Sequence, residues 1–414
     1  MRKIIASVDI GSHSIKVVVG EIHKNKLNVL AVNEEPSQGI GRGFVVNSQK
    51  VKDSLKVCLD QIEETLGLKV RKVIVNIPAR DVIFDMTKGK TTITNTEHII
   101  SGDDIARALQ GCVYNKINPK YELVSIMPIY FLVDEEKKVA DPKGIIANKL
   151  EATSIIASAL KTNVYPILTC LEELGLEVID ITFNNIGDFY ATSSEVLATS
   201  NGAIVNVGHE VTDVAIFNKG VMANCTSINV GGKNIENDIK YIYKVQDKDA
   251  KKLKEKLALA HVQMASSSEK IKVKTLENEE IEINQYELSE IVMSRVIEIL
   301  NLVKKELNYL TKKQISYIMF TGGVTEMSDF KIALESVFGK NASVMNLREL
   351  GVRNNKYSSC VGMIKYFNNK MIFRNKEFSI FSIDEQEELG SHDKVVNVPE
   401  TSVLGKLFGY FFDN

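Results

Sequence analysis

One pattern of residues occurs twice in this chain, 197 positions apart. Its first copy spans residues 5–19 and its second copy spans residues 202–216. Each copy has an apolar, strand-forming run, a polar turn that begins with glycine, and a second apolar run. Two such runs joined by a short turn predict a β-hairpin. Because the pattern returns at a fixed distance, we expect two related halves that each begin with a hairpin.

The turn glycines of the two copies, Gly11 and Gly208, have two interpretations. A glycine at a hairpin tip often only supplies a positive φ angle, and this is the simpler interpretation of either copy alone. The two copies, however, also align Asp9 with Asn206. Two glycine tips that face each other present backbone N–H groups suited to a phosphate chain. The pair of copies therefore favours a phosphate-binding site.

A third segment supports the ligand interpretation. Residues 315–320 are strand-like and are followed by Thr321, Gly322 and Gly323. Paired glycines directly after a buried strand let a flat ligand approach the backbone closely. The three glycine-bearing segments together predict a site for a ligand that has both a phosphate chain and a flat group.

Composition excludes several classes of protein. The 414 residues suffice for two or more domains, and 44% hydrophobic and 25% charged residues are typical of a soluble globular protein. A net charge of −2 gives no reason to expect nucleic acid as a partner. Five scattered cysteines without a Cys-x-x-Cys spacing indicate reduced thiols and no metal cluster. We find neither a signal peptide nor an apolar run that would span a membrane, so we expect a cytosolic body.

The periodicity of apolar residues predicts the main elements. Helices are expected over residues 48–66, where Gly67 follows, and over residues 288–310. Residues 82–160 read as an inserted unit of strands with one helix. Residues 376–400 are acidic and weakly periodic, which predicts a disordered linker.

The last fourteen residues, 401–414, differ from the linker before them. Their large apolar side chains fall on one stripe of a helix, and Thr401 or Ser402 can cap its start. The structural alternative is a helix that docks on its own domain, but a long polar tether makes lipid insertion the preferred interpretation. With Lys406 as its one basic residue, a single tail should bind lipid weakly, and several tails on one assembly would bind firmly.

Several motifs now match one family. Residues 9–16 resemble the first phosphate loop of the actin superfamily, and residues 36–43 are similar to the stretch that follows it, with Gln38 where arginine is usual. Segments between 125 and 151 match an inserted subdomain, and residues 321–323 resemble the adenosine motif. The chain resembles FtsA, the actin-like family of bacterial cell division, over nearly its whole length.

The resemblance implies an α/β, actin-like ATPase fold of two duplicated ribonuclease-H-like lobes with an inserted small α+β subdomain. The expected divisions follow the family's subdomain names: 1–81 and 161–190 (1A), 82–160 (1C), 191–375 (second lobe, 2A and 2B, with 2B about 233–310), 376–400 (linker) and 401–414 (membrane-targeting helix).

The resemblance also implies a function. The family binds ATP with Mg²⁺, assembles with itself as a filament or dimer, and tethers FtsZ filaments to the cytoplasmic face of the membrane at the division site. Its implied partners are the C-terminal peptide of FtsZ, other division-ring proteins and membrane lipid, with no nucleic acid. Carried over by position, the implied site residues are Asp9 for Mg²⁺ through water; Gly11, Ser12, Lys16, Gly208 and Thr212 for phosphates; Gly232, Lys233 and Glu236 for the nucleoside; Gly322 and Gly323 for adenosine; Arg295 for the FtsZ peptide; and Val403, Leu404, Leu407, Phe408, Phe411 and Phe412 for the membrane.

One departure from the actin pattern bears on catalysis. The second phosphate loop has Asn206 where an aspartate is usual, and an amide cannot act as a base or an anionic metal ligand. Glu210 would repel a nearby phosphate unless a cation compensates. Residues 184–185 are short amides at the place where related ATPases orient water. We therefore expect nucleotide binding with slow or absent hydrolysis, and we name no catalytic residue.

Two further interpretations remain open. A PilM-like adaptor of pilus assembly would share the inserted subdomain but should lack a free amphipathic tail. A structural scaffold with an inactive pocket would share the whole fold and differ only in nucleotide binding.

Overall fold

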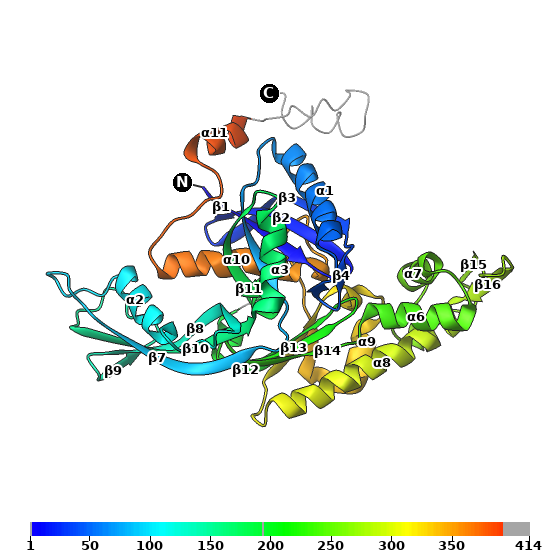
Figure 1. Ribbon diagram of the computed structural model, residues 1–414. Helices are drawn as coiled ribbons and strands as arrows, with labels where there is room; N and C mark the ends of the chain where they lie inside the picture. Colours follow the sequence, from blue (N-terminus) through cyan, green and yellow to red (C-terminus); the bar gives the residue numbers. More distant parts are fainter. Residues whose placement is uncertain (1, 193, 392–414) are drawn as a thin grey trace, which may run out of the picture.

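The computed structural model describes residues 2–192 and 194–391 (Figure 1). Its two largest sheets have the same order of strands. The first sheet runs β3 (Lys26–Pro36), β2 (Ser14–His23), β1 (Lys3–Ile10), β6 (Lys72–Ile77) and β11 (Glu177–Phe183). The second runs β14 (Val221–Ile228), β13 (Thr212–Asn218), β12 (Asn201–Val207), β17 (Tyr317–Thr321) and β18 (Ala342–Val344).

Each sheet is an antiparallel meander of three strands followed by two parallel strands. The repeat in the sequence is therefore a repeat of the fold, and the hairpins β1–β2 and β12–β13 are its matching parts. Their registers agree as well: Asp9 lies opposite Lys16 in the first hairpin, and Asn206 lies opposite Asp213 in the second.

Long helices cover the two sheets. The first, α1 (Ser48–Leu66), begins at Asn47, whose side chain accepts from Lys50 N, and ends at Gly67 with a positive φ of 73°. Its boundaries are those that the periodicity predicts, and its apolar residues pack against the first sheet. The second, α8 (Gln285–Leu310), begins three residues earlier than predicted, because Asn284 caps it by accepting from Glu287 N.

Two helices join the lobes. These are α4 (Asn184–Thr192), which contacts β11 and β12, and α10 (Ser358–Phe373), which contacts β1, β2 and β6. They cross at Gly187 and Gly362, where an added Cβ on Gly362 would lie 1.6 Å from the Gly187 carbonyl oxygen. Direct contact of the two backbones therefore requires glycine at the crossing.

A small unit projects from each lobe (Figure 1). The first is a sheet in the order β7 (Ile83–Thr92), β10 (Lys149–Leu160), β8 (Tyr121–Val133) and β9 (Lys137–Val139), covered by α2 (Gly102–Val113). The second contains α6 (Gly232–Tyr243), α7 (Asp247–Lys256), β15 (Lys270–Lys274) and β16 (Glu280–Asn284). The other elements are β4 (Ile40–Gly41), β5 (Phe44–Val45), α3 (Lys161–Glu172), α5 (Glu195–Thr199), α9 (Phe330–Phe338), α11 (Ile383–Ser391) and short 3₁₀ turns.

The segment after α10 corrects one prediction. The expected disordered linker over 376–400 is wrong as far as residue 391, where the described chain ends. Ile380 and Phe381 are buried, at 7% and 3% exposed, and Ile380 N donates to the Ile4 carbonyl (2.9 Å). The short apolar group packs on the first lobe although the surrounding sequence is acidic. The rest of the predicted linker and the tail 401–414 lie outside the described residues, within which no helix is long and apolar enough to cross a bilayer.

Candidate functional site

The two hairpin tips have the same local structure. Gly11 N donates to the Ser14 carbonyl (3.2 Å), and Gly208 N donates to the Val211 carbonyl (3.0 Å). A Cβ at Gly11 or Gly208 would lie 3.0 or 2.8 Å from that same carbonyl oxygen. Neither glycine has a positive φ, so close approach of backbone atoms, and not a left-handed conformation, selects glycine here. The simpler interpretation, that glycine supplies a positive φ angle at each tip, is therefore wrong.

The tips also touch across the gap between the lobes. The rings of His13 and His209 lie 4.6 Å apart between centroids, and His13 Nε2 lies 3.1 Å from Lys251 Nζ. Burial, together with Lys251 beside His13 and Lys254 beside His209, lowers the pKa of both imidazoles to about 4. Both rings are therefore neutral at pH 7, which allows them to lie in contact.

A cavity of about 440 Å³ lies between the lobes and reaches both tips. This volume lies in the range of small-molecule sites. Eight of the implied nucleotide residues line it: Asp9, Gly11, Ser12, Lys16, Gly208, Gly232, Gly322 and Gly323. The folded chain therefore brings the three glycine-bearing segments to one place.

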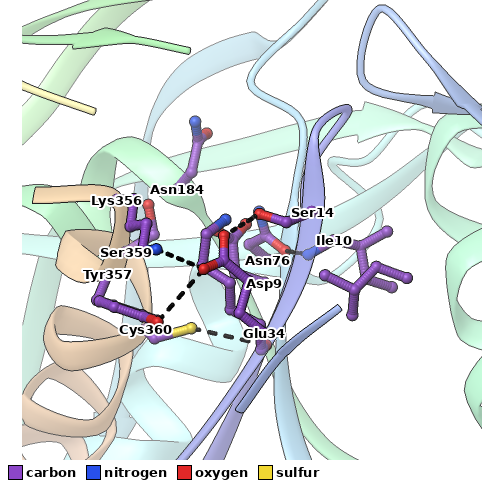
Figure 2. Close-up of polar contacts among 12 residues, drawn as sticks. Asp9, Ile10, Ser14, Glu34, Asn76, Asn184, Lys356, Tyr357, Ser359 and Cys360 are labelled. Atoms are coloured by element: carbon purple, nitrogen blue, oxygen red, sulfur yellow. Dashed lines mark hydrogen bonds and ion pairs between the residues drawn. The ribbon is translucent and has the colours of Figure 1, made fainter. Parts of the chain in front are cut away.

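Asp9 belongs to a buried network on one wall of this cavity (Figure 2). Its Oδ2 accepts from Lys16 Nζ (3.0 Å), and its Oδ1 accepts from Asn76 Nδ2 (2.7 Å). Burial by itself lowers the pKa of Lys16, but the Asp9 carboxylate raises it above the ordinary value. The lysine is therefore a fixed positive charge beside the first tip.

A second group on the cavity wall centres on Glu34 (Figure 2). Its carboxylate accepts from Ser14 Oγ (2.6 Å), from Lys356 Nζ and, more distantly, from the Tyr357 hydroxyl (3.5 Å). Burial by itself raises the pKa of Glu34, but the bonds from Lys356 and Ser14 lower it on balance. The charge of Lys356 is thus matched within the protein.

In the second hairpin, a carboxylate occupies the position that Lys16 has in the first hairpin. Asp213 lines the cavity and accepts from Asn184 Nδ2 (2.7 Å) and from Ser227 Oγ. Burial raises the pKa of Asp213 against these two hydrogen bonds. The other amide atom, Asn184 Oδ1, is buried and has no hydrogen-bond partner among the described residues. An acceptor is therefore left unused beside the cavity.

Behind the second tip lies another carboxylate, Asp188 in α4. Its Oδ1 accepts from Ser358 Oγ (2.6 Å) and Ser359 Oγ (2.8 Å), and its Oδ2 accepts from Asn206 Nδ2 (2.7 Å). Burial raises the pKa of Asp188 to about 7 in spite of these bonds. The residue connects α10, α4 and the strand that ends at Gly208.

Comparisons with known proteins place this chain in a family. A family model described as "Cell division protein FtsA" matches residues 203–362, and one described as "SHS2 domain inserted in FTSA" matches residues 82–157. FtsA of Bacillus subtilis is 27% identical over 367 residues, covering 88% of this chain and 83% of that protein. FtsA of Pseudomonas aeruginosa is 26% identical over 374 residues, covering 88% and 89%. The chain belongs to the FtsA family of cell-division proteins.

Solved structures confirm the actin-like fold predicted for this FtsA-family chain. The PilM–PilN type IV pilus biogenesis complex matches with a TM-score of 0.58 and 13% identity over 87% of this chain and 97% of the other. MreB5 of Spiroplasma citri bound to ADP matches with a TM-score of 0.56 and 13% identity over 90% and 98%. At such identities the likeness concerns the fold alone.

Three residues implied by the FtsA resemblance do not line the cavity. Thr212 is fully buried and donates to the Val230 carbonyl (2.8 Å), so it supports the turn before α6. Lys233 pairs with Glu210, and Glu236 pairs with Lys254. Lys233 therefore compensates the charge of Glu210, which was expected to repel a nearby phosphate.

Arg295, the residue implied for the FtsZ peptide, lies on α8 of this FtsA-family chain. Its guanidinium makes two bonds to Asp238 (2.6 and 2.9 Å) and one to Glu298 (2.5 Å). The implied membrane residues, from Val403 to Phe412, lie outside the described residues.

Residue-by-residue reading missed several groups at the cavity: Arg42, Arg80, Asp213, Lys254 and Lys356. Asp213 had a usable signal, because it lies 197 residues after Lys16 and is its counterpart in the repeat. The others come from turns, from a short 3₁₀ segment and from the last turn of α7, with no repeated pattern, so only the folded chain brings them together.

Proposed function

We propose that this FtsA-family chain binds ATP with Mg²⁺ in the cavity between its two glycine-tipped hairpins. The observation that carries the proposal is that Gly11 and Gly208, from the two repeated halves, face one cavity. Backbone N–H groups at two such turns suit a phosphate chain, and Lys16 supplies a charge beside it. Gly322 and Gly323 lie at the same cavity, where they leave room for the nucleoside.

The residues present fit a magnesium ion that is held mainly by phosphate and water. Within the part of the chain that the structure describes, no group of three or more histidine, cysteine or acidic side chains could hold a metal. Magnesium keeps several waters and takes one or two carboxylates together with phosphate oxygens. Asp9 and Asp213, two of the carboxylates that line the cavity, would contact those waters. The ion would neutralise phosphate charge at this site.

We further propose that hydrolysis is slow or absent. Asn206 donates to Asp188 and carries no charge. The Asp213 carboxylate already accepts a hydrogen bond from Asn184, so that oxygen is not free to orient a water molecule. Burial raises the pKa of Asp213, so this carboxylate is the one to replace in a test of any measured hydrolysis.

The second part of the proposal is attachment to FtsZ. An acidic, partly apolar peptide suits a surface that combines a basic group with exposed apolar side chains. Arg295 is half-buried, and Tyr241, Ile242 and Leu276 are 85%, 52% and 56% exposed. Leu276 N donates to the Lys244 carbonyl, which places it near the end of α6. A peptide carboxylate would compete with Asp238 for the arginine.

The third part is attachment to the membrane through residues 401–414, with self-assembly gathering several tails. A cosedimentation experiment tests it. The full chain and a 1–400 truncation are mixed with vesicles that contain phosphatidylglycerol, with and without MgATP and with and without FtsZ filaments. We expect the full chain to pellet and to carry FtsZ with it only when vesicles are present. Equal pelleting by the truncation would contradict the anchoring role.

Two alternatives are separated by simple observations. The fold is shared with PilM, but the matching family models and relatives are those of FtsA, which favours cell division. An inactive scaffold would show no saturable binding of ATP in a titration.

A further inference from the structure

The basic side chains that line the cavity fall into two groups. Each lysine has a carboxylate partner: Lys16 with Asp9, Lys254 with Glu236 and Lys356 with Glu34. The guanidinium groups of Arg42 and Arg80 have no carboxylate within ion-pair distance among residues 2–192 and 194–391. Within the described residues, these two positive charges are thus not neutralised by an ion pair.

Arg80 is held in place by both lobes. It follows β6 in the first lobe, and its Nη1 donates to Asn229 Oδ1 in the second lobe (3.1 Å). Its guanidinium also lies over the ring of Phe44, 5.2 Å from the centroid. These contacts fix the group while they use one of its five N–H donors. Its other donors make no hydrogen bond within the part of the chain that the structure describes, so they can bind an anion.

Arg42 belongs to the small β4–β5 hairpin that carries Phe44. Its backbone has a positive φ of 50°, and its N donates to Glu210 Oε2 (2.6 Å) across the gap between the lobes. The β4–β5 hairpin is therefore fastened to the second tip. The side chain of Arg42 is exposed and lines the same cavity as Arg80.

One carboxylate of the cavity wall, Asp213, lies within electrostatic range of Arg80. Burial is the main cause that raises the pKa of Asp213, and the charge of Arg80 opposes that increase. A phosphoryl group placed here would meet carboxylates on one side, so it needs a cation on the other. A guanidinium presents a planar fork of donors that matches phosphate oxygens, and the neighbouring lysines are already paired.

We propose that Arg80, assisted by Arg42, forms a phosphoryl-binding site at the cavity, which takes the terminal phosphate of a nucleoside triphosphate or free inorganic phosphate. This inference rests on the proposed nucleotide binding and deepens it. It makes Arg80 the residue that distinguishes a triphosphate from a diphosphate, because a diphosphate leaves the two guanidinium groups unmatched.

The competing explanation is that Arg80 only clamps the lobes together through Asn229. The two roles respond differently to substitution. Asn229→Ala removes the clamp and keeps the guanidinium, whereas Arg80→Lys keeps the charge and removes the fork. A clamp would affect every nucleotide alike, whereas a phosphoryl site would affect only the triphosphate or free phosphate.

Isothermal titration of the full chain tests the proposal with Mg·AMP-PNP, with Mg·ADP, and with phosphate added to the ADP-loaded chain. The variants are Arg80→Ala, Arg80→Lys and Asn229→Ala, with Arg71→Ala as the control, since Arg71 is an exposed arginine that does not line the cavity. Thermal melting checks that each variant is folded.

We expect Arg80→Ala to weaken AMP-PNP binding at least tenfold and to change ADP binding less than twofold. Arg80→Lys should fall between Arg80→Ala and the unchanged chain, and Asn229→Ala and Arg71→Ala should keep the preference for the triphosphate. Phosphate binding to the ADP-loaded chain that Arg80→Ala abolishes would support free phosphate as a ligand. Equal weakening of both nucleotides by Arg80→Ala would overturn this site and leave nucleotide binding intact. An unchanged chain that binds neither nucleotide would overturn the proposed function itself.

Discussion

Replacement of Asp188 by asparagine should change how stability depends on pH. Asp188 is fully buried and accepts hydrogen bonds from Ser358, Ser359 and Asn206. Its pKa is raised to about 7, mainly by burial and to a smaller extent by the nearby Asp9. The variant keeps the shape of the side chain and cannot ionise.

The sign of the effect follows from the two pKa values. Below about pH 4 the carboxyl is protonated in both states, so it adds no pH dependence. Between about pH 4 and pH 7 only the unfolded chain loses the proton, which lowers the free energy of unfolding as pH rises. Each unit of pH in this window is worth about 1.4 kcal/mol, and the slope levels off near the folded pKa. We therefore expect a loss of about 2 kcal/mol from pH 5 to pH 7 that Asp188→Asn removes.

Urea unfolding at pH 5, 6, 7 and 8 measures this difference. The quantity of interest is the free energy of unfolding of Asp188→Asn minus that of the unchanged chain, which cancels the titration of other groups. It should rise with pH up to about 7 and then level off. Asp53→Asn, which replaces an exposed aspartate on α1, is the control variant. A flat difference for Asp188→Asn would show that Asp188 is ionised throughout and would refute the reasoning.

Three further predictions concern single residues. Gly208→Ala places a Cβ 2.8 Å from the Val211 carbonyl oxygen and should weaken ATP binding at least about tenfold in a titration while circular dichroism stays unchanged. Gly362→Ala pushes α10 away from Gly187 and should lower the free energy of unfolding by about 3 kcal/mol, seen as a lower melting temperature; an unchanged melting temperature would contradict the close crossing. Arg295→Ala should abolish binding of an FtsZ C-terminal peptide in fluorescence anisotropy and should alter stability by less than about 1 kcal/mol, because water still reaches both of its ion pairs. Unchanged anisotropy would remove the arginine from that site.

The parts of the fold that have a local, periodic signal could be predicted from the sequence. The hairpins at 5–19 and 202–216 each combine two short apolar runs with a glycine turn, and the helix over 48–66 has both a periodic apolar face and a terminal glycine. The docked segment at Phe378–Phe381 was missed because a few apolar residues in an acidic stretch do not reveal which surface they pack against.

The residues of the candidate site also fall into two groups, those with a local sequence signal and those without one. Gly11 and Gly208 could be found because each lies in a repeated turn. Asp188 and Arg80 could not, because their importance depends on burial and on partners that are 18 to 171 residues away in the chain. A carboxylate on a helix and an arginine after a strand are ordinary surface residues until the fold encloses them. The contact of His13 with His209 has the same origin, since it exists only when the two lobes meet.

The central claim is that the two glycine tips hold one triphosphate between them. A crystal structure of the full chain with Mg·AMP-PNP tests it most directly. The account predicts that the phosphates lie between Gly11 and Gly208, within hydrogen-bond distance of backbone N–H groups from both turns. A nucleotide bound at any other place, or contacts to one tip alone, would contradict it.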